Sequence, residues 1–231
     1  MFKEKRKFKN SKGLIISAIY EGQNKNAPVV VLCHGYGSSK DKDSTKGLAQ
    51  KLVDAGLCVY RFDFTGCGES RGKLSELTPD QGQDDLKSAV KDLGKKNFGL
   101  YGSSFGGYTA LIFASQNPVL ALGLKAPVSD YPAVMNAKGN EKENKALDFT
   151  EEAYKYDVYK LARNITSPTL IVHGDSDTDV PLAQSQNLLK SLASKDKELK
   201  ILPGAGHIMR DNYLEEANNQ LARFFSEKLL K

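Results

Sequence analysis

Short apolar runs alternate along this chain with segments of helical periodicity, and this alternation is the feature that most constrains the fold. Val29–Cys33 is a continuous apolar run, as in a strand that is buried on both faces. Strands of this kind that are joined by helices form a mostly parallel sheet covered by helices on both faces. We therefore expect an α/β fold, a doubly wound and mostly parallel sheet of about eight strands, in one domain over residues 1–231.

The pattern predicts where most of the individual elements lie. The first two strands form a hairpin around Ser11-Lys12-Gly13, and Thr78, Pro79 and Gln81 supply an N-cap, a first-turn proline and a capping-box glutamine. The expected strands are 5–9, 14–20, 29–33, 58–62, 98–101, 121–125, 169–173 and 199–202. The expected helices are 45–55, 79 to about 94, 105–116, 182–193 and 213–229.

One interval, 128–167, breaks the alternation and is rich in charged residues and tyrosine. In doubly wound folds, functional groups gather at the carboxyl ends of the strands, where insertions can cover the site. We interpret 128–167 as a lid insertion. The alternative is a long connection with a purely structural role.

Charge gives little reason to expect a nucleic-acid partner. The chain has 33 basic and 28 acidic residues, for a formal net charge of +5. The basic residues near its start have no interleaved aromatics and no binding motif, so we interpret them as the solvated side of an edge strand that resists aggregation. They are Lys3, Lys5, Arg6, Lys7, Lys9 and Lys12.

The cysteines and the hydropathy pattern suggest a compartment. Cys33, Cys58 and Cys67 are an odd number without metal-ligand spacing, which fits a reducing environment. The sequence shows neither the apolar core of a signal peptide nor the roughly 20 apolar residues of a membrane span. We expect a cytoplasmic protein without a membrane span.

The segment Gly102-Ser103-Ser104-Phe105-Gly106 matches the pattern G-x-S-x-G. The five residues alone are a weak signal, but here an apolar strand precedes them and an Ala/Leu/Phe-rich helix follows. In this context the central serine occupies a sharp strand-to-helix turn that exposes its hydroxyl. The spacing selects Ser104 over Ser103 as a nucleophile.

A serine hydroxyl needs a base, and the chain has three histidines. His34 and His173 each follow a buried strand next to a glycine, and we expect both to tie loops together by hydrogen bonds. His207 lies in a glycine-rich loop between the last strand and the last helix, at the same edge of the sheet as Ser104. We therefore expect His207 to be the base.

The acid that orients the base should lie between the serine and the histidine in chain order. The loop after the strand 169–173 offers Asp175, Asp177 and Asp179. Asp175 is placed to shape the turn, and Asp179 to cap the following helix. Spacing favours Asp177 without excluding the other two.

An oxyanion hole should complete such a site. One donor is expected to be the backbone N–H of Phe105, which follows the nucleophile. The other is expected from the loop His34-Gly35-Tyr36-Gly37, and we assign it to the N–H of Tyr36.

Taken together, these segments resemble the α/β-hydrolase superfamily of serine hydrolases over nearly the whole chain. The resemblance is greatest to the small esterases related to cinnamoyl (feruloyl) esterases, acylglycerol lipases and prolyl-oligopeptidase-like hydrolases. The segment from Asp63 to Ser70 also matches this superfamily. The resemblance implies that this loop is mainly structural and that Cys67 is a candidate for an oxidation-sensitive thiol. It also implies that Asp177, three residues after Gly174, is the acid.

The resemblance leaves the substrate open. Cinnamoyl esterases have phenylalanine and threonine where this chain has Tyr36 and Gly37, and their insertion is longer than 128–167. Candidate substrate-binding residues, which could equally pack within the lid, are Tyr131, Tyr154, Tyr156 and Tyr159.

We expect hydrolysis of a small-molecule ester through an acyl-enzyme, without a metal or other cofactor. The alternatives are cleavage of amides, as in peptidases or acylaminoacyl hydrolases, and a non-catalytic scaffold. The sequence also allows a homodimer.

Overall fold

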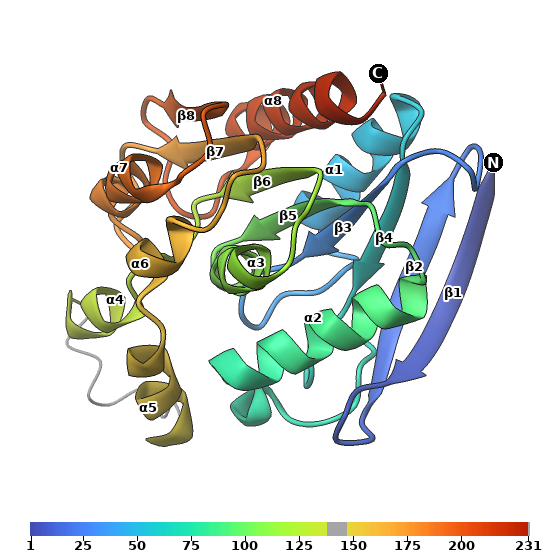
Figure 1. Ribbon diagram of the computed structural model, residues 1–231, viewed down its shortest axis with the longest axis horizontal. Helices are drawn as coiled ribbons and strands as arrows, with labels where there is room; N and C mark the ends of the chain where they lie inside the picture. The colour runs from blue at the N-terminus through green and yellow to red at the C-terminus, as the bar shows by residue number, and fades with distance from the viewer. Residues whose placement is uncertain (138–146, 231) are drawn as a thin grey trace.

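An eight-stranded sheet forms the centre of the computed structural model (Figure 1). The structure describes residues 1–137 and 147–230. The first two strands run antiparallel to their neighbours and the others are parallel, so the expected fold class is confirmed. In spatial order the strands are β1 (Phe2–Lys9), β2 (Ile15–Gly22), β4 (Cys58–Phe62), β3 (Val29–Cys33), β5 (Gly99–Ser103), β6 (Ala121–Lys125), β7 (Thr169–Gly174) and β8 (Lys197–Leu202).

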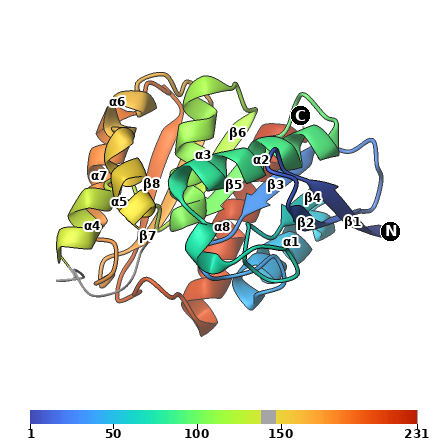
Figure 2. The same cartoon turned by 90° about the horizontal axis from the view of Figure 1, so that it is seen from below.

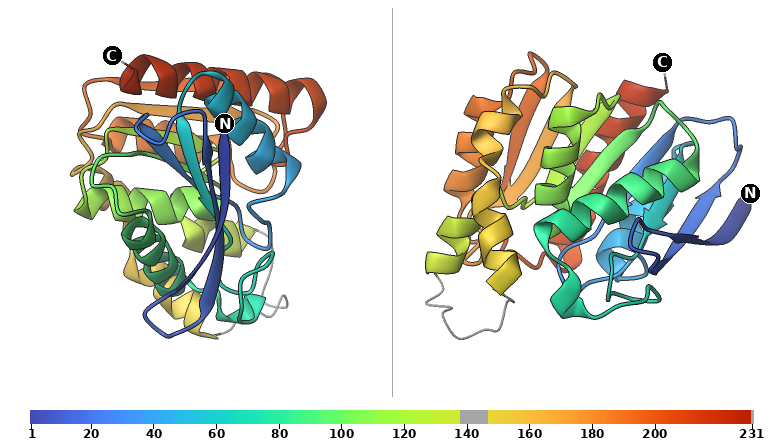
Figure 3. Two further views of the ribbon diagram at one scale, coloured as in Figure 1. Left: turned by 90° about the vertical axis from the view of Figure 1, so that its right-hand side faces the viewer. Right: turned by 60° about the horizontal axis from the view of Figure 1, so that its bottom comes forward.

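Helices cover both faces of the sheet, as Figures 2 and 3 show. Helices α1 (Asp43–Asp54) and α8 (Asp211–Leu229) pack on one face, and α2 (Pro79–Leu93), α3 (Phe105–Gln116) and α7 (Leu182–Ser191) on the other. A short 3-10 helix, η1 (Leu74–Glu76), precedes α2.

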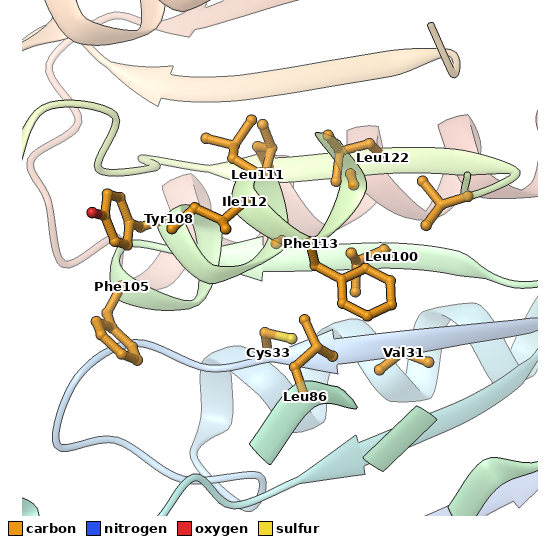
Figure 4. Close-up of a cluster of buried hydrophobic side chains, with 14 of the residues drawn as sticks. Val31, Cys33, Leu86, Leu100, Phe105, Tyr108, Leu111, Ile112, Phe113 and Leu122 are labelled. Atoms are coloured by element: carbon orange, nitrogen blue, oxygen red, sulfur yellow. The ribbon is translucent and has the colours of Figure 1, made fainter. Parts of the chain in front are cut away.

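Helix α3 is central to the core because it is apolar on every side. Its residues from Phe105 to Ala114 are all buried, as expected of a helix enclosed by a sheet and other helices. Figure 4 shows Phe113 facing Leu100 of β5 and Val31 of β3. This packing fixes the start of α3, and therefore Ser104, against the carboxyl end of the sheet.

The basic residues near the start of the chain lie where the sequence predicted. Strand β1 is at the edge of the sheet, and its residues alternate between exposed and half-buried. Its four lysines are exposed, whereas Arg6 turns inward over the ring of Tyr20 at 4.9 Å. The interpretation as a solvated edge strand is confirmed.

Two predicted caps are wrong in detail. Thr78 Oγ1 does accept the N–H of Gln81, at 3.2 Å, and Gly94 ends α2 with φ 70°. No capping box forms, however, because the N–H of Thr78 donates to the carbonyl of Glu76 at 3.0 Å, and the side chain of Gln81 donates to Asp85 Oδ1 at 2.9 Å. At the start of α7 the N-cap is Pro181, and not the expected Asp179.

Short helices occupy the interval between β6 and β7. They are α4 (Tyr131–Ala137), α5 (Leu147–Lys155) and α6 (Val158–Ala162), and the part of the expected lid from 138 to 146 lies outside the described residues. Figure 1 shows α4 to the left of α3 and α5 at the lower left. The 3.6-residue periodicity did not predict them because each is short.

Candidate active site

Ser104 forms the turn between β5 and α3 with a strained backbone, φ 53° and ψ −116°. A non-glycine residue with positive φ costs about 1–3 kcal/mol and needs support from its surroundings. A Cβ on Gly102 would lie 2.3 Å from the carbonyl oxygen of Gly106, and one on Gly106 would lie 2.3 Å from that of Cys33. The two glycines therefore let the chain pass close enough to form this turn.

His207 lies beside Ser104, with its Nε2 3.0 Å from Ser104 Oγ. It comes from the loop between β8 and α8, and its side chain is 17% exposed. The ends of β5 and β8 meet at one edge because both strands are parallel members of the sheet. The structure thus brings together the serine and the histidine that the sequence selected.

Asp177 completes a line of three side chains. Its Oδ2 accepts a hydrogen bond from His207 Nδ1 at 2.8 Å, and its Oδ1 accepts the backbone N–H groups of Asp179 and Val180 at 2.9 and 2.8 Å. Burial alone would raise the pKa of this carboxyl, but hydrogen bonds from His173 and His207 and from the amide of Val180 outweigh it and hold the pKa far below its usual range. Asp177 is therefore ionised at any pH near neutrality.

The other two candidate acids lie elsewhere. Asp175 Oδ1 accepts the N–H of Gly204 at 2.7 Å, so this side chain joins the loop after β7 to the loop that carries His207. Asp179 donates its backbone N–H to Asp177. Among the three aspartates, Asp177 is the one whose carboxylate is hydrogen-bonded to the imidazole of His207.

The loop after β3 approaches Ser104 from the opposite side. A Cβ built on Gly35 would lie 3.5 Å from Ser104 Cβ, and the rings of Tyr36 and Phe105 are 5.8 Å apart. The hydroxyl of Tyr36 donates to the carbonyl of Leu74 at 3.1 Å. Tyr36 and Phe105, whose amides are the expected oxyanion donors, therefore both lie next to Ser104.

A buried ion pair holds this loop, and the sequence did not reveal it. Lys40 is 1% exposed, and its Nζ lies 2.7 Å from Asp63 Oδ2 and 2.7 Å from Glu69 Oε2. Asp63 also accepts the backbone N–H groups of Lys40 and Glu69, at 2.6 and 2.9 Å. Lys40 lies in the polar loop between β3 and α1, where a buried lysine leaves no periodic signal in the sequence.

The four tyrosines of 128–167 divide into different environments. Tyr131 is 4% exposed and its ring packs at 4.8 Å against that of Tyr108, next to Phe105. Tyr156 and Tyr159 are half-buried and bond to Asp80 and Ser129 respectively, whereas Tyr154 is 60% exposed. Tyr131 is the one among them that packs against the residue following Ser104.

The remaining histidine and cysteine predictions can be compared with the structure. His34 Nδ1 donates to the carbonyl of Gly35 and its Nε2 accepts the N–H of Phe64, so it joins two loops as expected. Cys67 is buried, and burial raises the pKa of its thiol to about 11, which disfavours the thiolate that oxidation requires. Across residues 1–137 and 147–230, no group of three or more His, Cys, Asp or Glu side chains is arranged to hold a metal.

The arrangement has the parts that nucleophilic catalysis needs. An ionised carboxylate fixes the proton of His207 on Nδ1, which leaves Nε2 to accept the proton of Ser104 Oγ.

Among the described residues, no helix combines the length and the apolar character needed to cross a membrane.

Known proteins of similar sequence include hydrolases. An uncharacterized protein of Mycobacterium tuberculosis is 28% identical over 187 residues, a match that covers 79% of this chain and 63% of that protein, less than two thirds of its length. A monoacylglycerol lipase of Mycolicibacterium smegmatis is 28% identical over 233 residues, covering 78% of this chain and 80% of the lipase.

Comparison with solved structures identifies the fold. The structure of Est1E from Butyrivibrio proteoclasticus, determined with bound ferulic acid, superposes with a TM-score of 0.86 at 22% identity, covering 98% of this chain and all of that one. This confirms the α/β-hydrolase fold. Residues 48–231 match the model of the prolyl oligopeptidase family, which is most of the chain. The chain therefore belongs to the prolyl oligopeptidase family.

Proposed function

We propose that this protein is a serine hydrolase that cleaves carboxylic esters of small to medium acyl or aromatic groups. The observation that carries the proposal is the position of His207, whose two ring nitrogens lie 3.0 Å from Ser104 Oγ and 2.8 Å from Asp177 Oδ2. In this proposal Ser104 is the nucleophile, His207 the general base and Asp177 the orienting acid.

The first half of the reaction forms an acyl-enzyme. His207 Nε2 takes the proton of Ser104 Oγ while the oxygen attacks the ester carbonyl. The negative charge that develops on the carbonyl oxygen is stabilised by the amides of Tyr36 and Phe105. His207 then gives its proton to the leaving alcohol, and Ser104 carries the acyl group.

The second half releases the acid. A water molecule takes the place of the alcohol, His207 accepts one of its protons, and the resulting hydroxide attacks the acyl carbonyl. The intermediate collapses as His207 returns the proton to Ser104 Oγ. Asp177 stays ionised throughout, because its pKa lies far below neutrality.

The helices α4 to α6 are proposed to act as the lid. Helix α5 is attached to the start of α2: Glu152 accepts the N–H of Asp80 at 2.8 Å, Lys155 pairs with Asp80 at 2.7 Å, and Tyr156 donates to the same carboxylate. Tyr131, at the start of α4, packs towards Phe105 with ring centroids 6.3 Å apart. An acyl or aromatic group on Ser104 would therefore meet an aromatic wall.

Two comparisons support an ester as the substrate. A monoacylglycerol lipase is among the proteins that this chain resembles in sequence, and the similar structure of Est1E was solved with ferulic acid, an aromatic acid, bound. The aromatic wall formed by Tyr36, Phe105 and Tyr131 has the chemistry to accept such groups.

The decisive experiment combines a fluorophosphonate probe with p-nitrophenyl esters from acetate to laurate and methyl ferulate. Ser104→Ala should lose both labelling and turnover, whereas Ser103→Ala, the matched control on the adjacent serine, should keep both. Circular dichroism would verify that both variants are folded. Turnover that survives in folded Ser104→Ala would contradict the proposal.

A second candidate function is amide cleavage, and the family assignment favours testing it. The same geometry can attack an amide, provided that His207 protonates the leaving amine. Aminoacyl anilides assayed beside the esters would decide between them. If Ser104 is labelled by neither probe nor substrate in folded protein, the chain acts as a non-catalytic scaffold.

A further inference from the structure

His173 contacts the proposed acid directly, although its place in the sequence suggested only a structural role. It is the fifth residue of β7, four positions before Asp177, and it is fully buried. Its Nε2 lies 3.0 Å from Asp177 Oδ2 and 2.9 Å from the carbonyl oxygen of Val180. Asp177 Oδ2 therefore has one imidazole on each side, His207 at 2.8 Å and His173 at 3.0 Å.

The neighbours of His173 determine where its proton lies. A carboxylate and a carbonyl oxygen can only accept, so Nε2 must carry a hydrogen that is shared between them. On the other side of the ring, Nδ1 lies 2.6 Å from the hydroxyl oxygen of Ser185, which is also fully buried. In the neutral ring this hydroxyl donates to Nδ1, and the contact selects the Nε2–H tautomer.

These contacts give the carboxylate of Asp177 four donors. Two are backbone amides on Oδ1, and two are imidazole N–H groups on Oδ2. A hydrogen bond from a second donor withdraws charge from the oxygen that faces His207 and fixes the plane of the carboxylate. Both effects act on His207 without any contact between His173 and the substrate.

We propose that His173 is a positioning residue, which orients Asp177 towards His207 and weakens its attraction for the proton on that ring. The inference rests on the proposed roles of Asp177 and His207. Its consequence is a base that gives up its proton at a lower pH than it would beside an Asp177 bonded to His207 alone. Ser185 supports the same function by fixing the tautomer of His173.

Other charged groups near His207 have to be kept constant for a test. Asp175 and Asp179 share the loop of Asp177, Lys125 ends the neighbouring strand β6, and Arg210 precedes α8. A substitution at His173 leaves all four in place. A change in the titration of His207 would therefore report on the contact between His173 and Asp177.

The test is an NMR titration of the imidazole nitrogens, which needs no substrate. Three histidines make assignment by single substitution straightforward. In the wild-type protein His173 should be the Nε2–H tautomer, and the titration midpoint measured there for His207 is the value against which the variants are compared. His173→Phe keeps the ring volume but removes the donor, and we expect the His207 midpoint to rise by roughly half to one pH unit.

His173→Gln is the matched control, because its amide can still donate from nearly the same position. It should bring the His207 midpoint back towards the wild-type value. In ester assays the acid limb of the kcat profile should move with the midpoint, while KM stays the same. A purely structural role would lower activity at every pH without moving the limb.

Three results would overturn the inference. These are an Nδ1–H tautomer at His173 in the wild-type protein, an unmoved His207 midpoint in folded His173→Phe, and equal shifts in the Phe and Gln variants. If His173→Phe does not fold, Ser185→Ala takes its place. It should raise the titration midpoint of His207 by less than the amount expected for His173→Phe. An unchanged midpoint in Ser185→Ala would then count against the inference. Loss of ester activity alone would affect the proposed function, and not this conclusion.

Discussion

His207 and Asp177 meet from the loops of two neighbouring strands, with Nδ1 and Oδ2 2.8 Å apart. The carboxylate is fully buried, whereas the imidazole is 17% exposed. This difference lets one edge of the ring face a fixed charge while the other faces Ser104. The orientation of the proposed base is therefore set from the interior of the protein.

Replacement of Asp177 tests this relationship. In Asp177→Asn the side-chain amide can point an N–H at His207 and favour the wrong tautomer, so we expect kcat to fall on the order of 10⁴-fold with little change in fold. Asp179→Asn is the matched control, and it should remain within a few-fold of wild type because its contact with Asp177 uses the backbone. A larger loss in Asp179→Asn would assign the acid to that residue.

The turn at Ser104 gives a prediction about stability. In Gly106→Ala the new Cβ would lie 2.3 Å from the carbonyl oxygen of Cys33, and this backbone cannot move without disturbing β3. We expect the free energy of unfolding to fall by about 1–3 kcal/mol or more. Gly206→Ala, where the nearest atom is 3.8 Å away, is the control that urea denaturation should find almost unchanged. Equal stability of both variants would contradict the close packing at the turn.

Much of this site could be predicted from sequence because its parts carry local signals. Ser104 lies between a strand and a helix at fixed spacing from two glycines, and His207 is the one histidine in a loop after the last strand. These features depend on backbone geometry that only certain residues allow. The strand Val29–Cys33 was predicted to the residue from another local signal, its continuous apolar run.

The parts that sequence could not reveal depend on how side chains meet in three dimensions. Lys40 pairs with Asp63, 23 residues further along the chain, and His173 contacts Asp177, four residues on, across the turn of the loop after β7. The helices between β6 and β7 are too short for a periodic pattern, and their positions come from packing: α5 contacts α2 and α4, and α6 contacts α3 and α7. No local propensity encodes such contacts.

The ion pair of Lys40 predicts a coupling between stability and activity. Lys40→Met leaves the fully buried carboxylate of Asp63 without its cation, and breaking a buried pair costs about 3–5 kcal/mol. Since the same loop carries Tyr36, kcat should fall as well. Lys42→Met, on an exposed neighbour, should change neither thermal unfolding nor kcat. Full stability in Lys40→Met would mean that the pair contributes nothing to the loop.

The aromatic wall predicts a change in acyl preference. Tyr131 is 4% exposed and packs between Phe105 and Tyr108, so Tyr131→Ala should open space for longer acyl chains. We expect the ratio of kcat/KM for the octanoate ester over the acetate to rise by roughly tenfold, about 1.4 kcal/mol. Tyr154→Ala, at a residue that is 60% exposed, should leave this ratio unchanged. If both variants behave alike, Tyr131 does not line the pocket.

Lys125 predicts a pH dependence of stability with a definite sign. This side chain ends β6, pairs in register with Ser103, and is 4% exposed, and burial lowers its pKa to about 8. An unfolded lysine has a pKa of about 10.4. Between pH 8 and 10.4 the unfolded chain therefore binds more protons than the folded one, and stability rises with pH across this window.

Lys125→Met removes this cost, so at pH 7 it should be more stable than wild type by up to about 3 kcal/mol, from the difference of roughly 2.4 pKa units. The advantage should shrink as the pH is raised from 8 to 10, because the wild-type lysine then becomes neutral when folded. Lys87→Met, on an exposed residue of α2, controls for the loss of one charge. Urea denaturation across this pH range measures the difference. An advantage that stays constant with pH would show that Lys125 keeps its proton in the folded protein, and that the benefit of methionine comes from packing alone.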